Sequence, residues 1–192
     1  LILNNTDAKF SFSTMFSDVN STTFDYYPSS IARNYIAYCF HSVDGYSKFG
    51  SYVGTGASGN SIVTGFRPAF VMIKRTDNTG NWWIVDNKRS PSNPRNNRLL
   101  ANTNNSEVVY TPGNSNFLAN GFQLAGTYNS TNASGGTYIY LAFAADPSTT
   151  TPSLANSFNT TLYSGSSSTP LNVSGIGFEA DFSWLKVRNN SW

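Results

Sequence analysis

The chain has 192 residues, of which 15% are aromatic and only 11% charged, and its formal net charge is +2. The sequence contains no run of about 18 apolar residues that could cross a membrane as a helix. The small net charge gives no general attraction to nucleic acid. The 14 Phe, 11 Tyr and 4 Trp residues argue against a disordered chain. Ser, Thr and Asn make up more than a third of the chain and, together with the aromatics, favour strands and turns over helices, so the composition predicts an all-β protein.

Runs of alternating or continuous apolar residues predict short strands along the whole chain. The predicted strands, in chain order, are Phe10–Phe16, 35–40, Gly45–Val53, 69–75, 81–86, Phe117–Leu124, 137–144 and Asp181–Val187. Short strands separated by polar turns are typical of a β-sandwich or jelly roll.

The connections between these strands carry turn-forming residues. Thr76–Gly80 has the composition of a hairpin loop between strands 69–75 and 81–86. The segment Ser90–Asn97 contains Pro91 and Pro94 and is predicted to be a loop, because proline cannot donate to a central β-ladder. Pro147–Pro152 is rich in Ser, Thr and Pro and is expected to be a linker.

Several segments recur in the same order along the chain. Gly65–Lys74 (Gly-Phe-Arg-Pro-Ala-Phe-Val-Met-Ile-Lys) returns as Gly177–Lys186, and Tyr35–Phe40 returns as Tyr138–Phe143. Two weaker echoes, of Leu3–Thr6 at Leu100–Thr103 and of Tyr52–Gly56 at Tyr163–Ser167, follow the same order. The pattern predicts tandem repeats of about 100 residues.

These echoes divide the chain into three parts: residues 1–43 as the back half of one repeat, 44–147 as a complete repeat, and 148–192 as the front of a further one. The last residues, Asn190-Ser-Trp192, resemble Asn81-Trp-Trp83 in the middle of the predicted hairpin. We therefore expect the chain to be a fragment of a longer repeat protein.

The sequence offers few groups for catalysis. Cys39, the single cysteine, lies in an apolar strand and is expected to be a buried filler. His41, the single histidine, follows the same strand, and its neighbours Ser42 and Asp44 do not form a recognisable nucleophile–base arrangement, so we expect a hydrogen-bonded histidine at a strand end. One His and one Cys cannot fill a zinc site.

Carboxylates that could act in pairs on glycosidic bonds are also scarce. The two glutamates are Glu107 and Glu179, and Arg67 stands in the place of Glu179 in the complete repeat. Asp77 and Asp86 flank the Trp hairpin and are expected to pair with Lys74, Arg75, Lys88 or Arg89. No catalytic residue, metal ligand set or cofactor is predicted, and the sequence leaves open a structural calcium ion held by loop carbonyls and one Asp.

The candidate binding residues lie in and beside the Trp hairpin. Trp82 and Trp83 are neighbours in a strand, so one is expected to face the core and the other to face outward or into a subunit contact, unless both are covered by the core or by the next repeat. An outward Trp next to basic residues could stack on a sugar or anchor a partner. The residues predicted to contact glycan or another subunit are Trp82, Trp83, Arg75, Lys88 and Arg89.

Four segments resemble a repeat domain, of unknown function, of large virion proteins of tailed bacteriophages, mainly marine ones. The segments are Tyr35–Tyr52, Gly65–Trp82, Asp86–Arg89 and Asn132–Ala144. The resemblance implies a lectin-like or jelly-roll β-sandwich repeat in a tail fibre or other virion surface protein, and it implies association into a homotrimer. The third repeat departs from the pattern, because Glu179-Ala-Asp181 replaces Arg-Pro-Ala.

The sequence therefore predicts a non-enzymatic module of a virion, outside the cell, that contacts host surface glycan through several weak sites and also contacts other virion proteins. A capsid or tail decoration protein that binds no receptor is the first alternative. A polysaccharide depolymerase is the second, and the unmatched glutamates disfavour it.

Overall fold

The computed structural model describes the chain from residue 5 to 187 with gaps, and the chain divides into two compact units. Unit 1 consists of Leu1–Phe10 and Asp44–Thr149, and unit 2 of Ser11–Val43 and Thr150–Trp192. The described residues are 5–9, 16–17, 20, 22–26, 34–145, 158–165 and 171–187. Unit 2 is thus assembled from two segments that are far apart in sequence. The division of the chain into three repeat parts stays a prediction.

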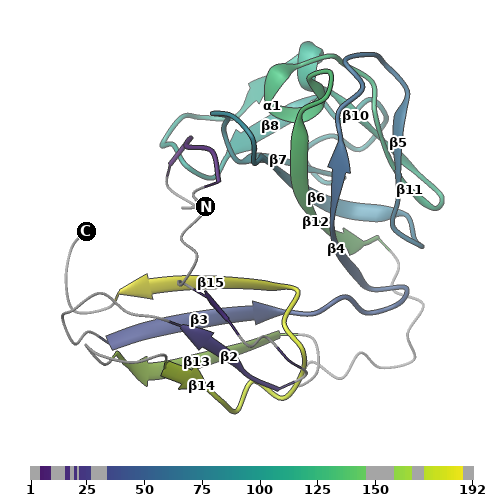
Figure 1. Cartoon of the computed structure of the whole chain (residues 1–192). Helices are drawn as coiled ribbons and strands as arrows, with labels where there is room; N and C mark the ends of the chain where they lie inside the picture. Colours follow the sequence, from purple (N-terminus) through teal and green to yellow (C-terminus); the bar gives the residue numbers. More distant parts are fainter. Residues whose placement is uncertain are drawn as a thin grey trace. The chain divides into compact units, whose positions relative to one another are not determined.

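Unit 1 is built from two antiparallel sheets (Figure 1). The larger has six strands in the order β4-β12-β6-β7-β8-β9, and the smaller has three in the order β10-β11-β5. The strands are β4 (Ser47–Val53), β5 (Asn60–Val63), β6 (Pro68–Arg75), β7 (Trp83–Asp86), β8 (Asn97–Leu100), β9 (Val108–Val109), β10 (Ser115–Leu118), β11 (Gly121–Leu124) and β12 (Thr137–Ala144). A 3₁₀ turn, η1 (Thr111–Gly113), and a one-turn helix, α1 (Asn129–Asn132), lie in the connections.

The core of unit 1 lies between these sheets. On β12, Tyr138, Tyr140 and Ala142 are buried while the residues between them are half-exposed, as a period of two requires. Trp83 and Val85 of β7 reach the same core from the large sheet, and the small sheet contributes aromatic and aliphatic side chains. Those side chains are Ile62, Phe117, Phe122 and Leu124.

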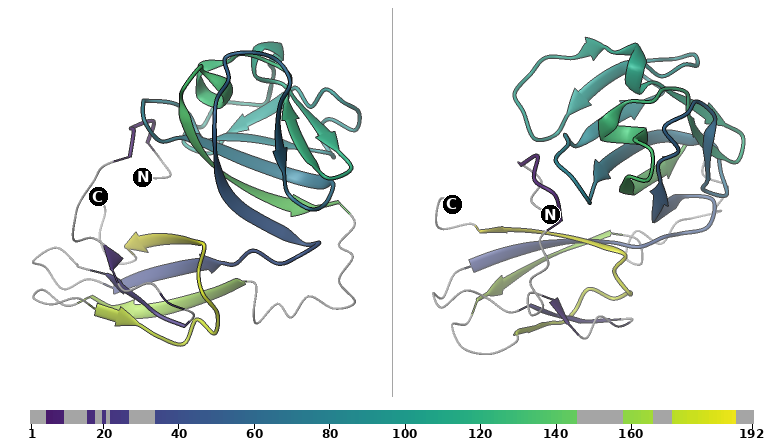
Figure 2. Two further views of the ribbon diagram at one scale, coloured as in Figure 1. Left: turned by 45° about the vertical axis from the view of Figure 1, so that its right-hand side comes forward. Right: turned by 45° about the horizontal axis from the view of Figure 1, so that its top comes forward.

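Unit 2 is a sandwich of two three-stranded antiparallel sheets, β1-β2-β14 and β13-β3-β15 (Figure 2). Its strands are β1 (Phe16–Ser17), β2 (Phe24–Tyr26), β3 (Asn34–Phe40), β13 (Phe158–Ser164), β14 (Leu171–Val173) and β15 (Phe182–Val187). Both sheets supply the core: Tyr35, Ala37 and Cys39 from β3 meet Phe24, Tyr26 and Val173.

The central strands of the two units are paired in the same way. In unit 1, β12 lies between β4 and β6, and in unit 2, β3 lies between β13 and β15. Tyr138 of β12 is opposite Tyr52 of β4, and their rings are stacked with centroids 4.9 Å apart. Tyr35 of β3 is opposite Tyr163 of β13, with stacked rings 5.3 Å apart.

The all-β prediction is confirmed, and most predicted strands have counterparts in the structure. The prediction for Phe117–Leu124 is wrong in detail: this segment is a hairpin of β10 and β11 around Ala119 and Asn120. The turn lets Phe117 and Phe122 lie opposite each other on the buried face of the small sheet. No strand was predicted at β2, β5, β8, β9, β13 or β14. The predicted strand Phe10–Phe16 lies outside the described residues except for its last residue, and the linker Pro147–Pro152 lies outside them entirely.

Candidate functional site

Neither tryptophan of the hairpin is exposed. Trp82 is 3% exposed and Trp83 is completely buried. The Trp83 ring packs so closely on η1 that a Cβ added to Gly113 would lie 2.5 Å from its Cη2 atom, which explains the glycine there. Of the two alternatives, the structure supports the one in which both indoles are covered, so neither ring face is available to stack on a sugar.

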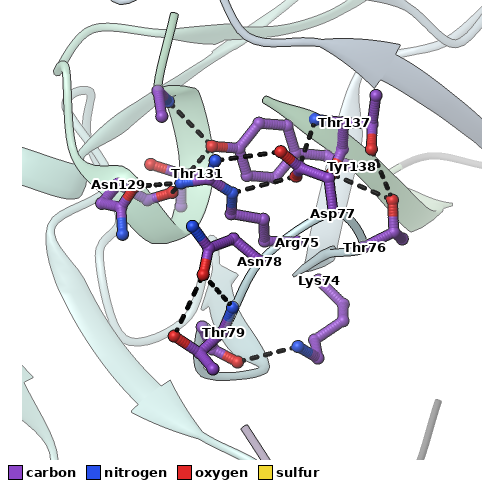
Figure 3. Close-up of polar contacts among 12 residues, drawn as sticks. Lys74, Arg75, Thr76, Asp77, Asn78, Thr79, Asn129, Thr131, Thr137 and Tyr138 are labelled. Carbon is purple, nitrogen blue, oxygen red and sulfur yellow. Dashed lines mark hydrogen bonds and ion pairs between the residues drawn. The ribbon is translucent and has the colours of Figure 1, made fainter. Parts of the chain in front are cut away.

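Arg75 is buried at the end of β6 and fully engaged within unit 1 (Figure 3). Its Nε and Nη2 atoms donate to the two carboxylate oxygens of Asp77, each at 3.0 Å, and Nη1 donates to the side chain of Asn129. The hydrogen bonds from Arg75 are the main cause that lowers the pKa of Asp77 to about 2, and the backbone N–H of Thr137 also donates to this carboxylate. Arg75 is therefore a structural cation rather than a free binding group.

Lys74, next to Arg75, is also buried. Its Nζ atom donates to three backbone carbonyls, those of Thr6 (3.1 Å), Asp7 (2.8 Å) and Gly80 (3.0 Å). Burial lowers the pKa of Lys74, and the negative charge of Asp7 partly opposes this shift. The lysine thereby fastens the N-terminal segment to the β6–β7 loop, where the Gly80 N–H donates to the Thr6 carbonyl.

The remaining two predicted cations differ from each other. Arg89 pairs with Asp86, as the sequence predicts, and its Nη1 lies 3.2 Å from Oε2 of Glu107. Lys88 is exposed, and its backbone N–H donates to Asp86. Of the five predicted binding residues, Lys88 is thus the one that is exposed to solvent. The five residues do not form one surface, because Trp82, Trp83 and Arg75 are buried.

Asn132, the last residue of α1, organises the loops at one end of unit 1. Its amide nitrogen donates to the carbonyls of Ala57 and Gly126, and its oxygen accepts from the Thr55 backbone and the Asn60 side chain at 2.9 Å each. A buried amide can satisfy both its donors and its acceptors in this way, so it joins the β4–β5 connection to the β11–β12 connection. This role was not predicted from the sequence.

A second group missed from sequence lies at the surface of unit 1, and we name it the aromatic–arginine cluster: Trp83, Arg98, Tyr110 and Tyr128. The Arg98 guanidinium lies over the Tyr110 ring, 4.2 Å from its centroid, and 5.0 Å from the centroid of Trp83. Tyr110 and Tyr128 meet edge to face at 4.9 Å. Burial and the neighbouring Tyr128 raise the pKa of Tyr110, so its hydroxyl stays protonated at neutral pH.

The cluster combines residues from three elements. Arg98 lies on β8, Tyr110 follows β9, and Tyr128 precedes α1. Arg98, Tyr110 and Tyr128 are each half-exposed, and the ion pairs among the described residues involve Arg75 and Arg89 but not Arg98. The cluster therefore presents a positioned guanidinium, outside those ion pairs, that lies over the phenol ring of Tyr110 and the indole of Trp83. Its only sequence signal is two tyrosines in otherwise polar loops.

In unit 2, Cys39 has the buried structural role expected from sequence, and His41 lies at the end of β3 beside a carboxylate. Cys39 is completely buried, and burial raises the pKa of its thiol. His41 Nδ1 lies 3.5 Å from the Asp181 carboxylate, which also accepts a hydrogen bond from the Ser42 backbone N–H. Asp181 thus ties the end of β3 to the start of β15.

Within the described ranges, no three His, Cys, Asp or Glu side chains are grouped so that they could hold a metal ion. The same part of the chain contains no helix with the length and apolar character needed to span a membrane.

No curated protein and no solved structure matches the chain. A family model described as a domain of unknown function (DUF7483) matches residues 1–147, which include the aromatic–arginine cluster and most of the described strands. Because that model covers more than half of the sequence, the protein belongs to the DUF7483 family.

Proposed function

We propose that the protein is a non-enzymatic structural and adhesion module of a phage virion appendage, such as a tail fibre, that contacts host surface glycan. The aromatic–arginine cluster is the observation that carries the adhesion part of this proposal. The phage assignment rests on the motif resemblance, and so does the expected homotrimer. The proposed activity requires no cofactor.

The chemistry of the cluster suits a sugar that bears a carboxylate, phosphate or sulfate. A guanidinium binds such a group through two parallel hydrogen bonds. Arg98 already rests on two rings, so little side-chain entropy is lost when a ligand binds. The phenol hydroxyls of Tyr110 and Tyr128 belong to half-exposed residues and can bond to sugar hydroxyls. One such site binds weakly, and several copies on an oligomer would bind by avidity.

The central strands β12 and β3 are paired in the same way in the two units, and this supports the proposed tandem-repeat architecture. The recurring segments Gly65–Lys74 and Gly177–Lys186 contain most of β6 and β15, and each of these strands pairs with the central strand of its unit. The segments Tyr35–Phe40 and Tyr138–Phe143 form those central strands, β3 and β12. Sequence echo and strand pairing therefore agree, as expected if both units derive from one ancestral sandwich.

A purely structural decoration protein is the second candidate. It is favoured by the burial of Trp82, Trp83 and Arg75, since these predicted binding residues are used inside the unit. A depolymerase is less well supported, because Glu107 is paired with Arg89 and Glu179 belongs to the other unit.

The test is binding of the full chain to acidic polysaccharide from a candidate host, compared between wild type, Arg98→Ala and Arg98→Lys. Loss of the bidentate contact is expected to weaken binding about tenfold in Arg98→Ala, with partial rescue in Arg98→Lys. Lys88→Ala is the matched control, because Lys88 is an exposed cation outside the cluster. Equal binding by all four proteins would reject the site, and release of reducing ends would favour the depolymerase.

A further inference from the structure

Arg95 lies in the connection between β7 and β8 and is enclosed by unit 1, being only 2% exposed. Its backbone forms an antiparallel bridge with Ser115 of β10, and each of the two N–H groups donates to the carbonyl of the other residue, at 2.6 and 3.2 Å. Two residues earlier, the side-chain amide of Asn93 bonds to both backbone groups of Phe117. The connection is therefore fastened along β10.

This pairing places the side chains of Arg95, Ser115 and Phe117 on one face of β10. Residues directly opposite each other in an antiparallel bridge project to the same side, and so do residues two apart on one strand. The guanidinium accordingly lies over the Phe117 ring, 5.2 Å from its centroid. All three residues are buried, and Ser115 is completely so.

Two polar atoms of this buried group have no protein partner. Nη1 of Arg95 donates to the Ser90 carbonyl. Nε of Arg95 and Oγ of Ser115 are also buried, but neither has a hydrogen-bond partner among the described residues. Both atoms carry a hydrogen that can be donated. Because buried polar groups are almost always bonded, two unused donors on opposed side chains point to an acceptor that does not come from the described chain.

The charge of Arg95 points to the same acceptor. The ion pairs of the described residues include neither Arg95 nor a carboxylate beside it. Burial lowers the pKa of Arg95, the positive charge of Arg67 adds to this shift, and Asp86 partly opposes it. The Asp86 carboxylate is already bound by Arg89. A buried guanidinium in these surroundings is stabilised by a negative charge close to it.

We propose that Arg95 and Ser115 bind a small monovalent anion, chloride, between the β7–β8 connection and β10. The Nε–H of Arg95 and the Oγ–H of Ser115 both donate to the ion, which balances the buried charge and holds the connection on β10. Burial of both residues excludes a larger anion such as a sugar acid. The site shares no residue with the aromatic–arginine cluster, so it is independent of glycan binding.

The first experiment follows amide hydrogen exchange of the full chain in sodium chloride and in sodium gluconate at equal ionic strength. Opening of the connection must release the ion, so exchange at Arg95 and Ser115 should slow about tenfold at a chloride concentration about ten times the Kd. The amides of β3 in unit 2 are the internal control and should exchange equally in both salts. Equal exchange of Arg95 and Ser115 in the two salts would overturn the proposal.

The second experiment measures the chloride dependence of thermal unfolding in three variants. Ser115→Ala removes one donor and little volume, and it should weaken chloride binding about tenfold. Arg95→Met removes the charge and should abolish the dependence. Lys88→Met is the matched control, because Lys88 is an exposed cation of the same connection, and it should keep the full dependence. If Arg95→Met does not fold, Ser115→Ala still decides: an unchanged chloride dependence in that variant would overturn the proposal.

The third experiment locates the ion with bromide, which scatters anomalously, in crystals of the full chain. An anomalous peak within hydrogen-bond distance of both Arg95 Nε and Ser115 Oγ supports the site. Either of two results would overturn it. One is an ordered water on the two atoms that bromide does not replace. The other is a direct hydrogen bond from Nε to Oγ with no ion beside it.

Discussion

The two units begin from the same three-stranded arrangement and complete it differently. Unit 1 extends the sheet with β7, β8 and β9 and covers its core with a second sheet. Unit 2 covers the corresponding strands with the three short strands β1, β2 and β14. The comparison shows that the same stacked tyrosine pair on an alternating central strand occurs in two units whose remaining strands differ.

The units also differ in how they use buried polar groups. Unit 1 encloses Lys74, Arg75 and Asn132, each with several hydrogen-bond partners. In the described part of unit 2 the core consists of aromatic and aliphatic side chains with one thiol. We therefore expect unit 1 to depend on specific hydrogen bonds and unit 2 on apolar packing, and four substitutions test this contrast.

The largest effect is expected for Trp83→Ala, which removes the largest fully buried side chain of unit 1. The lost burial and the cavity should cost about 4 kcal/mol of the free energy of unfolding. Denaturant unfolding followed by the near-UV signal is the measurement, with Trp83→Phe as the milder control. A loss below that of Trp83→Phe would show that Trp83 does not anchor the core.

Asn132→Ala should cost about 3 kcal/mol, because the backbone groups of Thr55, Ala57 and Gly126 would lose their partner inside the protein. Hydrogen exchange should rise in the loops around these residues and stay unchanged in unit 2. The matched control is Asn105→Ala, an exposed asparagine of the same unit, for which no measurable loss is expected.

In unit 2, Cys39→Ser places a hydroxyl in the core, where the Ser183 hydroxyl donates to the Cys39 sulfur at 3.8 Å. That distance is too long for a good bond between two hydroxyls, so Cys39→Ser should cost about 2 kcal/mol, whereas Cys39→Ala should cost less. Thermal unfolding of both variants tests the contrast directly. If serine were tolerated better than alanine, the core of unit 2 would contain a hydrogen-bond partner strong enough to remove the distinction between the units.

The smallest effect is expected for Asp77→Asn. The pKa of Asp77 is lowered to about 2 in the folded protein, so its contribution is present above the unfolded value near 3.8 and is lost as the pH falls toward 2. Because this carboxylate is 37% exposed, solvent screening should keep the loss at pH 7 below about 1 kcal/mol. Unfolding curves at pH 7, 4 and 2 should converge for variant and wild type at the lowest pH, and a constant difference would contradict the ion pair.

The parts of the fold that could be predicted from sequence are those rich in aromatic and aliphatic residues. Residues 137–144 form a nearly continuous apolar run and residues 181–187 contain four apolar residues, and these segments match β12 and β15 within one residue. β13 was missed because Asn159, Thr160 and Thr161 dilute the alternation. The β10–β11 hairpin was missed because its turn is Ala119-Asn120, one residue before the Asn120-Gly121 pair that would indicate a hairpin.

The candidate site was harder to predict, because residue type gives no measure of burial. The pairing of Asp77 with Arg75 and of Asp86 with Arg89 followed from proximity in sequence. The burial of Trp82 depends on tertiary packing. The contacts of Arg98 with Trp83 and Tyr110 depend on connections between strands that no local pattern describes.

The discontinuous chain of unit 2 has a consequence for the order of folding. Residues 11–43 and 150–192 must find each other across the whole of unit 1, and closing so long an unstructured loop is entropically costly. Once unit 1 has folded, its own ends are joined, since the Ala144 N–H donates to the Tyr46 carbonyl. During synthesis the first segment of unit 2 therefore lacks the strands that it pairs with until unit 1 has closed and β13, β14 and β15 have left the ribosome.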